Sequence, residues 1–258
     1  MRSEGKSKMR IRPVGYIAIT PLLFSLASFA FAVDGIALIR QTPTTVFPVV
    51  ISAPGSYRLA SNLRVASTSV DAIDIRANNV TLDLNGFSII GPHSGTGNGI
   101  NAGVNASSCY PPNVTVTNVT VTNGVVTAMG GSGICLGSYA HVEGVRALGN
   151  GGSGIDVNSF ARIIGNVCNK NLATGIACGR DCVISGNTTN SNFEGIVTSD
   201  NAAVLGNAVS LNSDDGLILL GTVPTYSGFG KNVMENNSVV CADGGTSIGD
   251  NVCNGRTL

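Results

Sequence analysis

Apolar and polar residues follow one another in a short repeating pattern through most of the chain. A Gly-Ile or Gly-Leu pair begins at Gly133, Gly154, Gly175, Gly195 and Gly216. A second marker is a glycine, found at Gly144, Gly165, Gly186 and Gly206. A third marker is an asparagine, found at Asn150, Asn171, Asn192 and Asn212. Because all three markers recur at steps of 20 or 21 residues, we interpret the spacing as a structural repeat.

The repeat is too short for the common helical repeats, which need about 33 residues or more. It is rich in Val, Ile, Thr, Asn and Gly, and it lacks the leucine pattern of leucine-rich repeats. Upstream, residues 113–124 alternate strictly between polar and apolar positions, as strands do. We therefore predict an all-β parallel solenoid in which about seven coils span residues 46–240. Residues 33–45 and 241–258 are predicted to cap its open ends, and residues 221–231 to protrude as a loop.

The period also predicts which side chains become neighbours, because residues one repeat apart lie on adjacent coils about 4.8 Å apart. One inward apolar column contains Ile134, Ile155, Ile176, Ile196 and Leu217. A second contains Val142, Ile163, Ile184 and Val204. The recurring asparagines are predicted to bond amide to amide between coils, as is a further column of Asn166, Asn187 and Asn207. The recurring glycines are expected at turns with positive φ or where coils approach closely.

Two upstream segments point to a family. Residues 55–59 read Gly-Ser-Tyr-Arg-Leu, and residues 79–89 read Asn-Val-Thr-Leu-Asp-Leu-Asn-Gly-Phe-Ser-Ile. Together with the Gly-Ile and Gly-Asn coils, this texture resembles the right-handed parallel β-helix proteins of the pectin-lyase-like superfamily, over about residues 46–240. The resemblance implies a right-handed parallel β-helix. It specifies the fold more than the activity, because the superfamily contains polysaccharide lyases, hydrolases, epimerases and a periplasmic copper-handling group.

Residues 1–32 are predicted to be a signal peptide. Five basic residues precede an uncharged run over residues 14–32, which ends in Ala30-Phe31-Ala32. An uncleaved membrane anchor is the alternative, because such a run nearly spans a bilayer. We expect a secreted or periplasmic monomer with no transmembrane segment in the mature chain. Only 12% of residues are charged, with 15 basic and 15 acidic side chains, and no basic cluster follows the leader; this argues against nucleic-acid binding.

Seven cysteines in an exported chain favour disulfides. The predicted pairs are Cys241–Cys253, Cys178–Cys182 and Cys109–Cys135. Cys168 is then left over, and we expect it to be a buried thiol. No metal site is predicted, because the cysteine spacing is not typical of zinc sites and the two histidines fall in different coils.

Glu194, Asp214 and Asp215 form the strongest acidic cluster, because Glu194 and Asp215 fall in one column of adjacent coils. Such a cluster would act as a general acid/base pair or hold Ca²⁺, the one cofactor considered. The alternative, which we favour, is that these carboxylates accept bonds from backbone N–H groups at a turn and face solvent. The resemblance supports the alternative, because the Gly-His-Gly and Arg-Ile-Lys elements of polygalacturonases and the arginine–aspartate cluster of the lyases are missing.

Four residues with outward parity are candidates for ligand binding: Tyr139, His141, Phe160 and Arg162. Two aromatic rings on adjacent coils beside a guanidinium group would receive the face of a sugar. The alternative, which we favour, is burial of these residues under the N-terminal cap or under the loop at residues 221–231. His141 and Glu143 are expected to form a surface pair.

These observations predict an exported β-helix module without catalytic activity that contacts polysaccharide or the cell envelope. One alternative is a carbohydrate-active enzyme, a polysaccharide lyase, hydrolase or epimerase, that uses the acidic cluster on the side of the solenoid. Another is a purely structural envelope protein.

Overall fold

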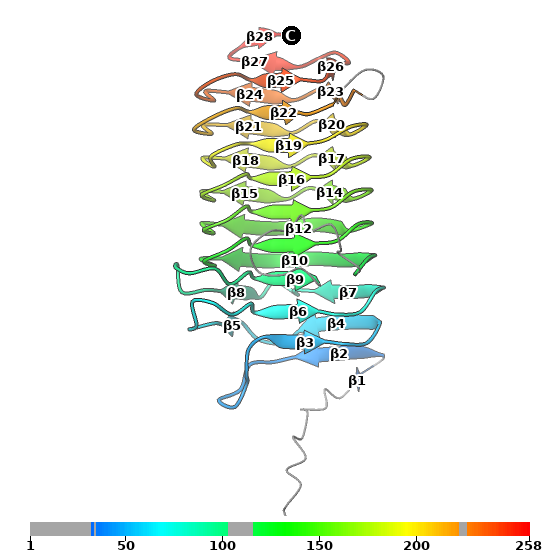
Figure 1. Cartoon of the computed structure of the whole chain (residues 1–258), viewed down its shortest axis with the longest axis vertical. Helices are drawn as coiled ribbons and strands as arrows, with labels where there is room; N and C mark the ends of the chain where they lie inside the picture. Colours follow the sequence, from blue (N-terminus) through cyan, green and yellow to red (C-terminus); the bar gives the residue numbers. More distant parts are fainter. Residues whose placement is uncertain (1–31, 34, 103–115, 222–225) are drawn as a thin grey trace, which may run out of the picture.

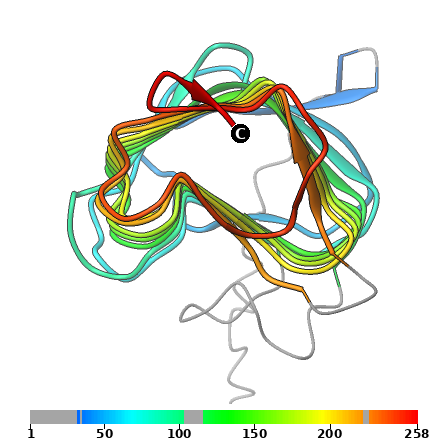
Figure 2. The ribbon, with the colours of Figure 1, turned by 90° about the horizontal axis from the view of Figure 1, so that it is seen from above.

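The computed structural model describes residues 32–33, 35–102, 116–221 and 226–258, and every regular element in these ranges is a β-strand. The chain winds as a right-handed parallel β-helix of about ten turns, whose long axis is vertical in Figure 1. Seen along that axis, the coils superimpose closely, and their outline is indented on one side (Figure 2). The predicted fold class is therefore confirmed. The described residues contain no helix long and apolar enough to cross a membrane.

One face of the solenoid is a parallel sheet of nine short strands, each from a different coil. Its strands are β3 (Val49–Ile51), β6 (Ile73–Ile75), β9 (Ile100–Ala102), β11 (Ile134–Leu136), β13 (Ile155–Val157), β16 (Ile176–Cys178), β19 (Ile196–Thr198), β22 (Leu217–Leu219) and β25 (Ala242–Gly244). Every neighbouring pair in this sheet is parallel, so each coil adds one strand in the same direction.

The other two faces join into one sheet, because the long strands β10 (Val119–Thr127) and β12 (His141–Leu148) run through both. The second face contains β4 (Gly55–Leu59), β7 (Val80–Asp83), β14 (Arg162–Ile164), β17 (Val183–Ser185), β20 (Ala203–Leu205), β23 (Gly228–Gly230) and β26 (Thr246–Ser247). The third face contains β5 (Leu63–Arg64), β8 (Ser88–Ile90), β15 (Val167–Asn169), β18 (Thr188–Asn190), β21 (Ala208–Ser210), β24 (Val233–Glu235) and β27 (Val252–Cys253). The end strands are β1 (Ala32–Val33), β2 (Ile36–Ile39) and β28 (Arg256–Thr257).

The core follows the predicted register. Ile134, Ile155, Ile176, Ile196 and Leu217 are Cα partners in successive strands, and all five are fully buried. The second predicted column, from Val142 to Val204, is likewise paired and buried. Full burial of such a side chain contributes about 1.5–3 kcal/mol relative to exposure. Stacking of the coils therefore supplies a core that no single coil has.

Two asparagine ladders run along the solenoid, as predicted, and both are longer than expected. The first continues from Asn212 to Asn237. The second continues from Asn207 to Asn232 and Asn251. In each step the Nδ2 amide donates to the Oδ1 of the next coil and to a backbone carbonyl, so these buried polar groups are satisfied.

The glycines occupy the two kinds of position that were predicted. Gly144, Gly165, Gly186 and Gly206 all have φ of +64°, a conformation that side chains rarely adopt. At Gly154, a Cβ atom would lie 2.7 Å from the carbonyl oxygen of Gly175 in the next coil. Turn geometry explains the first column of glycines, and close packing between coils explains the second.

The number of coils was underestimated, at about seven instead of about ten. Val49, Ile73 and Ile100 are successive partners although 24 and 27 residues separate them, so the early coils do not keep the 20-to-21-residue step. At the other end, residues 241–258 contribute β25, β26 and β27 in parallel register before β28 turns back antiparallel to β27.

The predicted loop at residues 221–231 is wrong over residues 228–230, which form β23 and pair with β20. Phe229 is the reason, because its ring continues the inward column above Val204 and is buried. Residues 222–225 lie outside the described residues, as does the predicted signal peptide except for Ala32.

Candidate functional site

Two surface sites flank the nine-stranded sheet, one at each end of its strands. The first lies in the turns that lead into the sheet and contains the predicted acidic residues. Thr174 Oγ1 donates a hydrogen bond to Glu194 Oε2 at 2.7 Å. The backbone N–H of Val240 donates to Asp215 Oδ1 at 3.0 Å. Two of the three carboxylates thus accept bonds from neighbouring coils, but only Asp215 accepts one from a backbone N–H group, whereas Glu194 accepts one from a side-chain hydroxyl.

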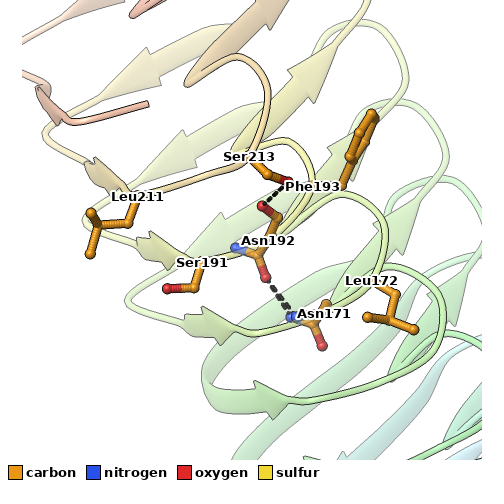
Figure 3. Close-up of a pocket in the computed structure, with 7 residues that line it drawn as sticks. All are labelled: Asn171, Leu172, Ser191, Asn192, Phe193, Leu211 and Ser213. Carbon is orange, nitrogen blue, oxygen red and sulfur yellow. Dashed lines mark hydrogen bonds between the residues drawn. The ribbon is translucent and has the colours of Figure 1, made fainter. Parts of the chain in front are cut away.

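Beside these carboxylates lies a cavity of about 210 Å³, which we call the groove. It is lined by Asn171, Leu172, Ser191, Asn192, Phe193, Leu211 and Ser213 (Figure 3). Leu172, Phe193 and Leu211 are exposed by 77%, 48% and 54%. The backbone N–H of Asp214 donates to the carbonyl of Phe193 at 2.8 Å, so the groove and the acidic cluster are contiguous.

Sequence reasoning missed the groove, although the chain contains a signal for it. Three residues separate Asn171 from Gly175 in one coil, but only two separate Asn192 from Gly195 in the next. The shorter turn carries Phe193 and accounts for the single 20-residue step in the period. The shortened turn therefore marks the coil at which the groove lies.

The second site, the corner column, lies in the turns that leave the nine-stranded sheet and consists of Tyr139, Phe160, Arg180 and Asp181. The rings of Tyr139 and Phe160 are stacked, with centroids 5.0 Å apart and planes inclined by 11°. Their exposed fractions are 56% and 41%, so the expectation that they are buried is wrong. The guanidinium carbon of Arg180 lies 5.7 Å from the centroid of the Phe160 ring.

Arg180 was missed because it lies one residue before the position that the period aligns with Phe160. That position is Asp181, which has φ of +58°, close to the +60° of Tyr139 and the +61° of Phe160. The Asp181 carboxylate pairs with Arg180, at 3.0 Å from Nε to Oδ2. The ion pair fixes the direction of the arginine side chain, which the repeat pattern does not determine.

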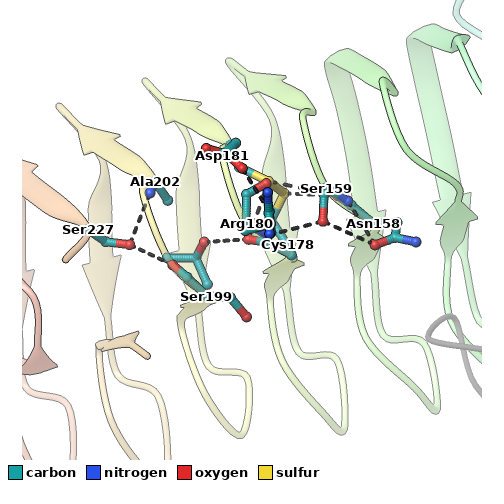
Figure 4. Close-up of polar contacts among 11 residues, drawn as sticks. Asn158, Ser159, Cys178, Arg180, Asp181, Ser199, Ala202 and Ser227 are labelled. Carbon is teal, nitrogen blue, oxygen red and sulfur yellow. Dashed lines mark hydrogen bonds and ion pairs between the residues drawn. A yellow bond between two sulfur atoms is a disulfide. The ribbon is translucent and has the colours of Figure 1, made fainter. Parts of the chain in front are cut away.

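Polar contacts hold the turn that presents Arg180 (Figure 4). Its backbone N–H donates to Ser159 Oγ at 3.3 Å, and the backbone N–H of Ser159 donates to Asn158 Oδ1 at 2.9 Å. The predicted disulfide between Cys178 and Cys182 closes the same turn. A covalent link and hydrogen bonds to the coil below therefore restrict this part of the corner column.

The remaining predicted ligand-binding residues lie on the strands next to the corner column. His141 and Arg162 are Cα partners in β12 and β14, and Arg162 is exposed. His141 Nε2 lies 3.3 Å from Glu143 Oε2, which is the expected surface pair. No carboxylate of the described residues pairs with Arg162.

The outer face of the nine-stranded sheet contains one unusual carboxyl group, on Asp156. Its neighbours in register are Cys135 and Ala177, both buried. Asp156 Oδ1 is buried without a hydrogen-bond partner, and burial raises the pKa of this carboxyl group to about 7. A protonated carboxyl group is the form that such surroundings favour.

The cysteines follow the sequence predictions where the structure describes them. Cys241 and Cys253 form a disulfide, as do Cys178 and Cys182, and Cys168 is free and buried. Burial also raises the pKa of the Cys168 thiol. Cys109 lies outside the described residues, so its predicted pairing with Cys135 is untested. Within the described ranges, no group of three or more His, Cys, Asp or Glu side chains is placed to hold a metal ion.

Comparisons with known proteins identify the fold. No protein-family model and no curated protein sequence matches the chain. The Dettilon tailspike protein matches with a TM-score of 0.55 and 15% identity, over 84% of this chain and 55% of the tailspike chain. The A-module of the Azotobacter vinelandii mannuronan C-5 epimerase AlgE4 gives a TM-score of 0.44 and 12% identity, over 85% and 86% of the two chains. The chain thus spans about half the length of the tailspike protein. The strand ladders and the similarity to the tailspike protein together show that the chain is a parallel β-helix repeat protein.

Proposed function

We propose that this β-helix is an exported module that binds a polysaccharide through the corner column. The supporting observation is the exposed stack of Tyr139 and Phe160, capped by the guanidinium group of Arg180. Aromatic rings bind the apolar faces of sugars, while a guanidinium group donates hydrogen bonds to sugar hydroxyl or carboxylate oxygens. The resemblance to a superfamily rich in polysaccharide-acting proteins points to the same class of ligand, and the disulfides agree with an oxidising compartment.

The backbone conformation at the two aromatic residues directs their rings away from the coil. Positive φ is rare for bulky side chains, and holding one there costs on the order of 1–3 kcal/mol. Tyr139 and Phe160 both have such a conformation, although glycine or asparagine would fit the turn without this cost. Asn118, Asp181 and Asn201 have the same conformation at this turn in other coils, so the conformation belongs to the turn; at Tyr139 and Phe160 it presents two rings to solvent.

Within the column, Tyr139 is expected to make the largest contact. Phe160 lies between Tyr139 and Arg180, whereas no second ring of the described residues stacks on Tyr139. Among the described residues, one face of the Tyr139 ring thus has no aromatic neighbour. Arg162, exposed and without an ion pair in the described ranges, adds a donor at the edge of the site.

The test compares variants of the mature chain for retention on a panel of immobilised plant, algal and bacterial glycans. Tyr139→Ala should weaken binding to the retained glycan roughly three- to tenfold, because one stacking contact is lost. Tyr139→Ala combined with Phe160→Ala should abolish retention. Val183→Ala removes an exposed side chain from β17, next to Arg162 in register, and serves as the matched control. Equal retention of the double variant and the control would refute the proposal.

A carbohydrate-active enzyme is the second candidate, and the groove beside Glu194, Asp214 and Asp215 favours it. Paired carboxylates next to a cavity are the minimum that glycoside hydrolysis needs. The same panel would be incubated with the protein and assayed for new reducing ends and for unsaturated products that absorb ultraviolet light. Turnover that Asp215→Asn abolishes would establish this function. Retention without turnover would exclude it for the glycans tested.

A further inference from the structure

We propose that the groove is a second glycan site, selective for an uncharged sugar residue with an apolar substituent such as a 6-deoxy methyl group. The inference rests on the proposed function for the glycan nature of the ligand. It concerns a different part of the surface, because the groove and the corner column lie at opposite ends of the strands of the nine-stranded sheet. Its basis is the shape, the lining and the charge of the groove.

The lining of the groove is unusually apolar for an exposed surface. Leu172, Phe193 and Leu211 come from three successive coils, and all three are exposed, Phe193 the least at 48%. Exposed apolar side chains that gather around a cavity indicate a binding site more often than scattered ones do. The ring of Phe193 offers a surface for a sugar face, and the two leucines offer a place for a methyl group.

The polar groups of the groove fall into two kinds. The Asn171 and Asn192 amides belong to the buried ladder and bond to one another, with Nδ2 of Asn171 donating to Oδ1 of Asn192 at 2.9 Å. They are therefore committed to the fold. Ser213 Oγ donates to the carbonyl of Asn192 at 3.3 Å, and Ser191 Oγ donates to Asn190 Oδ1. Both serine oxygens retain lone pairs that can accept bonds from sugar hydroxyls.

The net negative charge around the groove disfavours binding of an acidic sugar. We call the residues next to this lining the rim: Glu194 and Asp214 directly follow the lining residues Phe193 and Ser213, Asp215 comes next, and Lys170 directly precedes Asn171. Three carboxylates against one ammonium group leave the rim negative, so a uronate would be repelled. The corner column differs, because it combines aromatic rings with Arg162 and Arg180. The two sites should therefore recognise sugar residues of different charge.

The test uses probes that differ only at carbon 6. These are the methyl glycosides of a hexose, its 6-deoxy form and its uronate, in the gluco and galacto series. Binding would be followed through the methyl resonances of Leu172 and Leu211 in a leucine-methyl-labelled protein. The 6-deoxy glycoside of one series should shift both leucine resonances in a saturable way. Its dissociation constant should be at least fivefold lower than that of the uronate of the same series. Uronates that bind equally well, or no saturable shift with any glycoside, would overturn the proposal.

Variants separate this inference from the proposed function. Phe193→Ala should weaken 6-deoxy glycoside binding roughly three- to tenfold, and Leu211→Ser should weaken it as well; both replace exposed side chains. Tyr139→Ala should leave the leucine shifts unchanged, because it alters the other site. Loss of glycan retention in Tyr139→Ala without any leucine shift would overturn the groove proposal alone. The opposite outcome is that the leucine resonances shift while the variants at Tyr139 and Phe160 still retain the glycan normally. That outcome would overturn the corner site alone.

Discussion

Asp156 differs from another aspartate of its column in the surroundings of its side chain. The outward column of the nine-stranded sheet includes Cys135, Asp156, Ala177 and Asp243, which the repeat treats as equivalent. Asp243 is exposed, whereas Asp156 keeps an unpartnered oxygen in a buried place. A carboxyl group in such surroundings is more costly to ionise than one in water, which is why its pKa rises to about 7.

The pKa of Asp156 predicts a specific pH dependence of stability. The folded value of about 7 lies above the ordinary value of 3.8, so the folded state binds the proton more tightly than the unfolded state. The free energy of unfolding should therefore fall as pH rises from about 4 to about 7, by at most about 1.4 kcal/mol per unit, and then level off. Asp156→Asn should remove this decline and stabilise the protein at neutral pH.

Urea unfolding of the two proteins at intervals of pH measures this difference directly. Asp243→Asn, at an exposed position of the same column, is the matched control and should follow the parent protein. A constant difference in unfolding free energy between the parent and Asp156→Asn across the whole range would contradict the prediction.

At the scale of the structural element, the asparagine ladders tie each coil to the next. Asn187 Nδ2 donates to the carbonyl of Ile163 and to Oδ1 of Asn207. Its own Oδ1 accepts from the backbone N–H and the Nδ2 of Asn166. All these groups are buried, so removing the amide leaves several donors and acceptors without partners.

Asn187→Ala should lower the free energy of unfolding by about 2–4 kcal/mol, because buried groups lose their partners. Asn190→Ala is the matched control, since this outward asparagine is only half-buried and its Nδ2 donates one bond, to Ser210 Oγ. It should cost about 1 kcal/mol or less. Thermal or urea unfolding provides the comparison, and equal losses in the two variants would show that the ladder is not a special source of stability.

At the scale of the whole molecule, the solenoid is a one-dimensional stack in which each coil contacts only its neighbours. The terminal coils have a neighbour on one side only, so they should open most readily. The disulfide between Cys241 and Cys253 joins β27 to the chain just before β25, within the last coil. This link restrains the end that packing secures least.

Replacing both Cys241 and Cys253 by serine should increase amide hydrogen exchange in β25, β26 and β27. A loop of this length contributes about 2–3 kcal/mol through the disulfide. Exchange in β13, β16 and β19 should hardly change, because nearest-neighbour coupling confines the loss to the end of the stack. Faster exchange throughout the molecule would contradict this one-dimensional description.

Most of the scaffold was predictable, because the 20-to-21-residue period sets the contacts along the axis wherever the coils keep it. Ile155 and Ile176 had to be neighbours once the 21-residue step was taken as one turn, and the same holds for Asn166 and Asn187. The prediction is wrong where the step changes, as in the early coils and at Phe229. A period carries no information about a coil that does not keep it.

The sequence by itself determined which residues of successive coils are neighbours and which columns point inward. It also determined two cysteine pairs, Cys178–Cys182 and Cys241–Cys253. Only the tertiary structure decided what lies open to solvent. In the structure, Tyr139 and Phe160 are exposed, Arg180 lies over the Phe160 ring, and Phe193 lines a surface cavity. The physical reason is that stacking contacts repeat along the axis and follow from spacing. Exposure instead depends on how the three faces fold around the cross-section and on local changes in turn length. A shortened turn is visible in the sequence as a departure from the period, but the departure does not say which side chains become exposed.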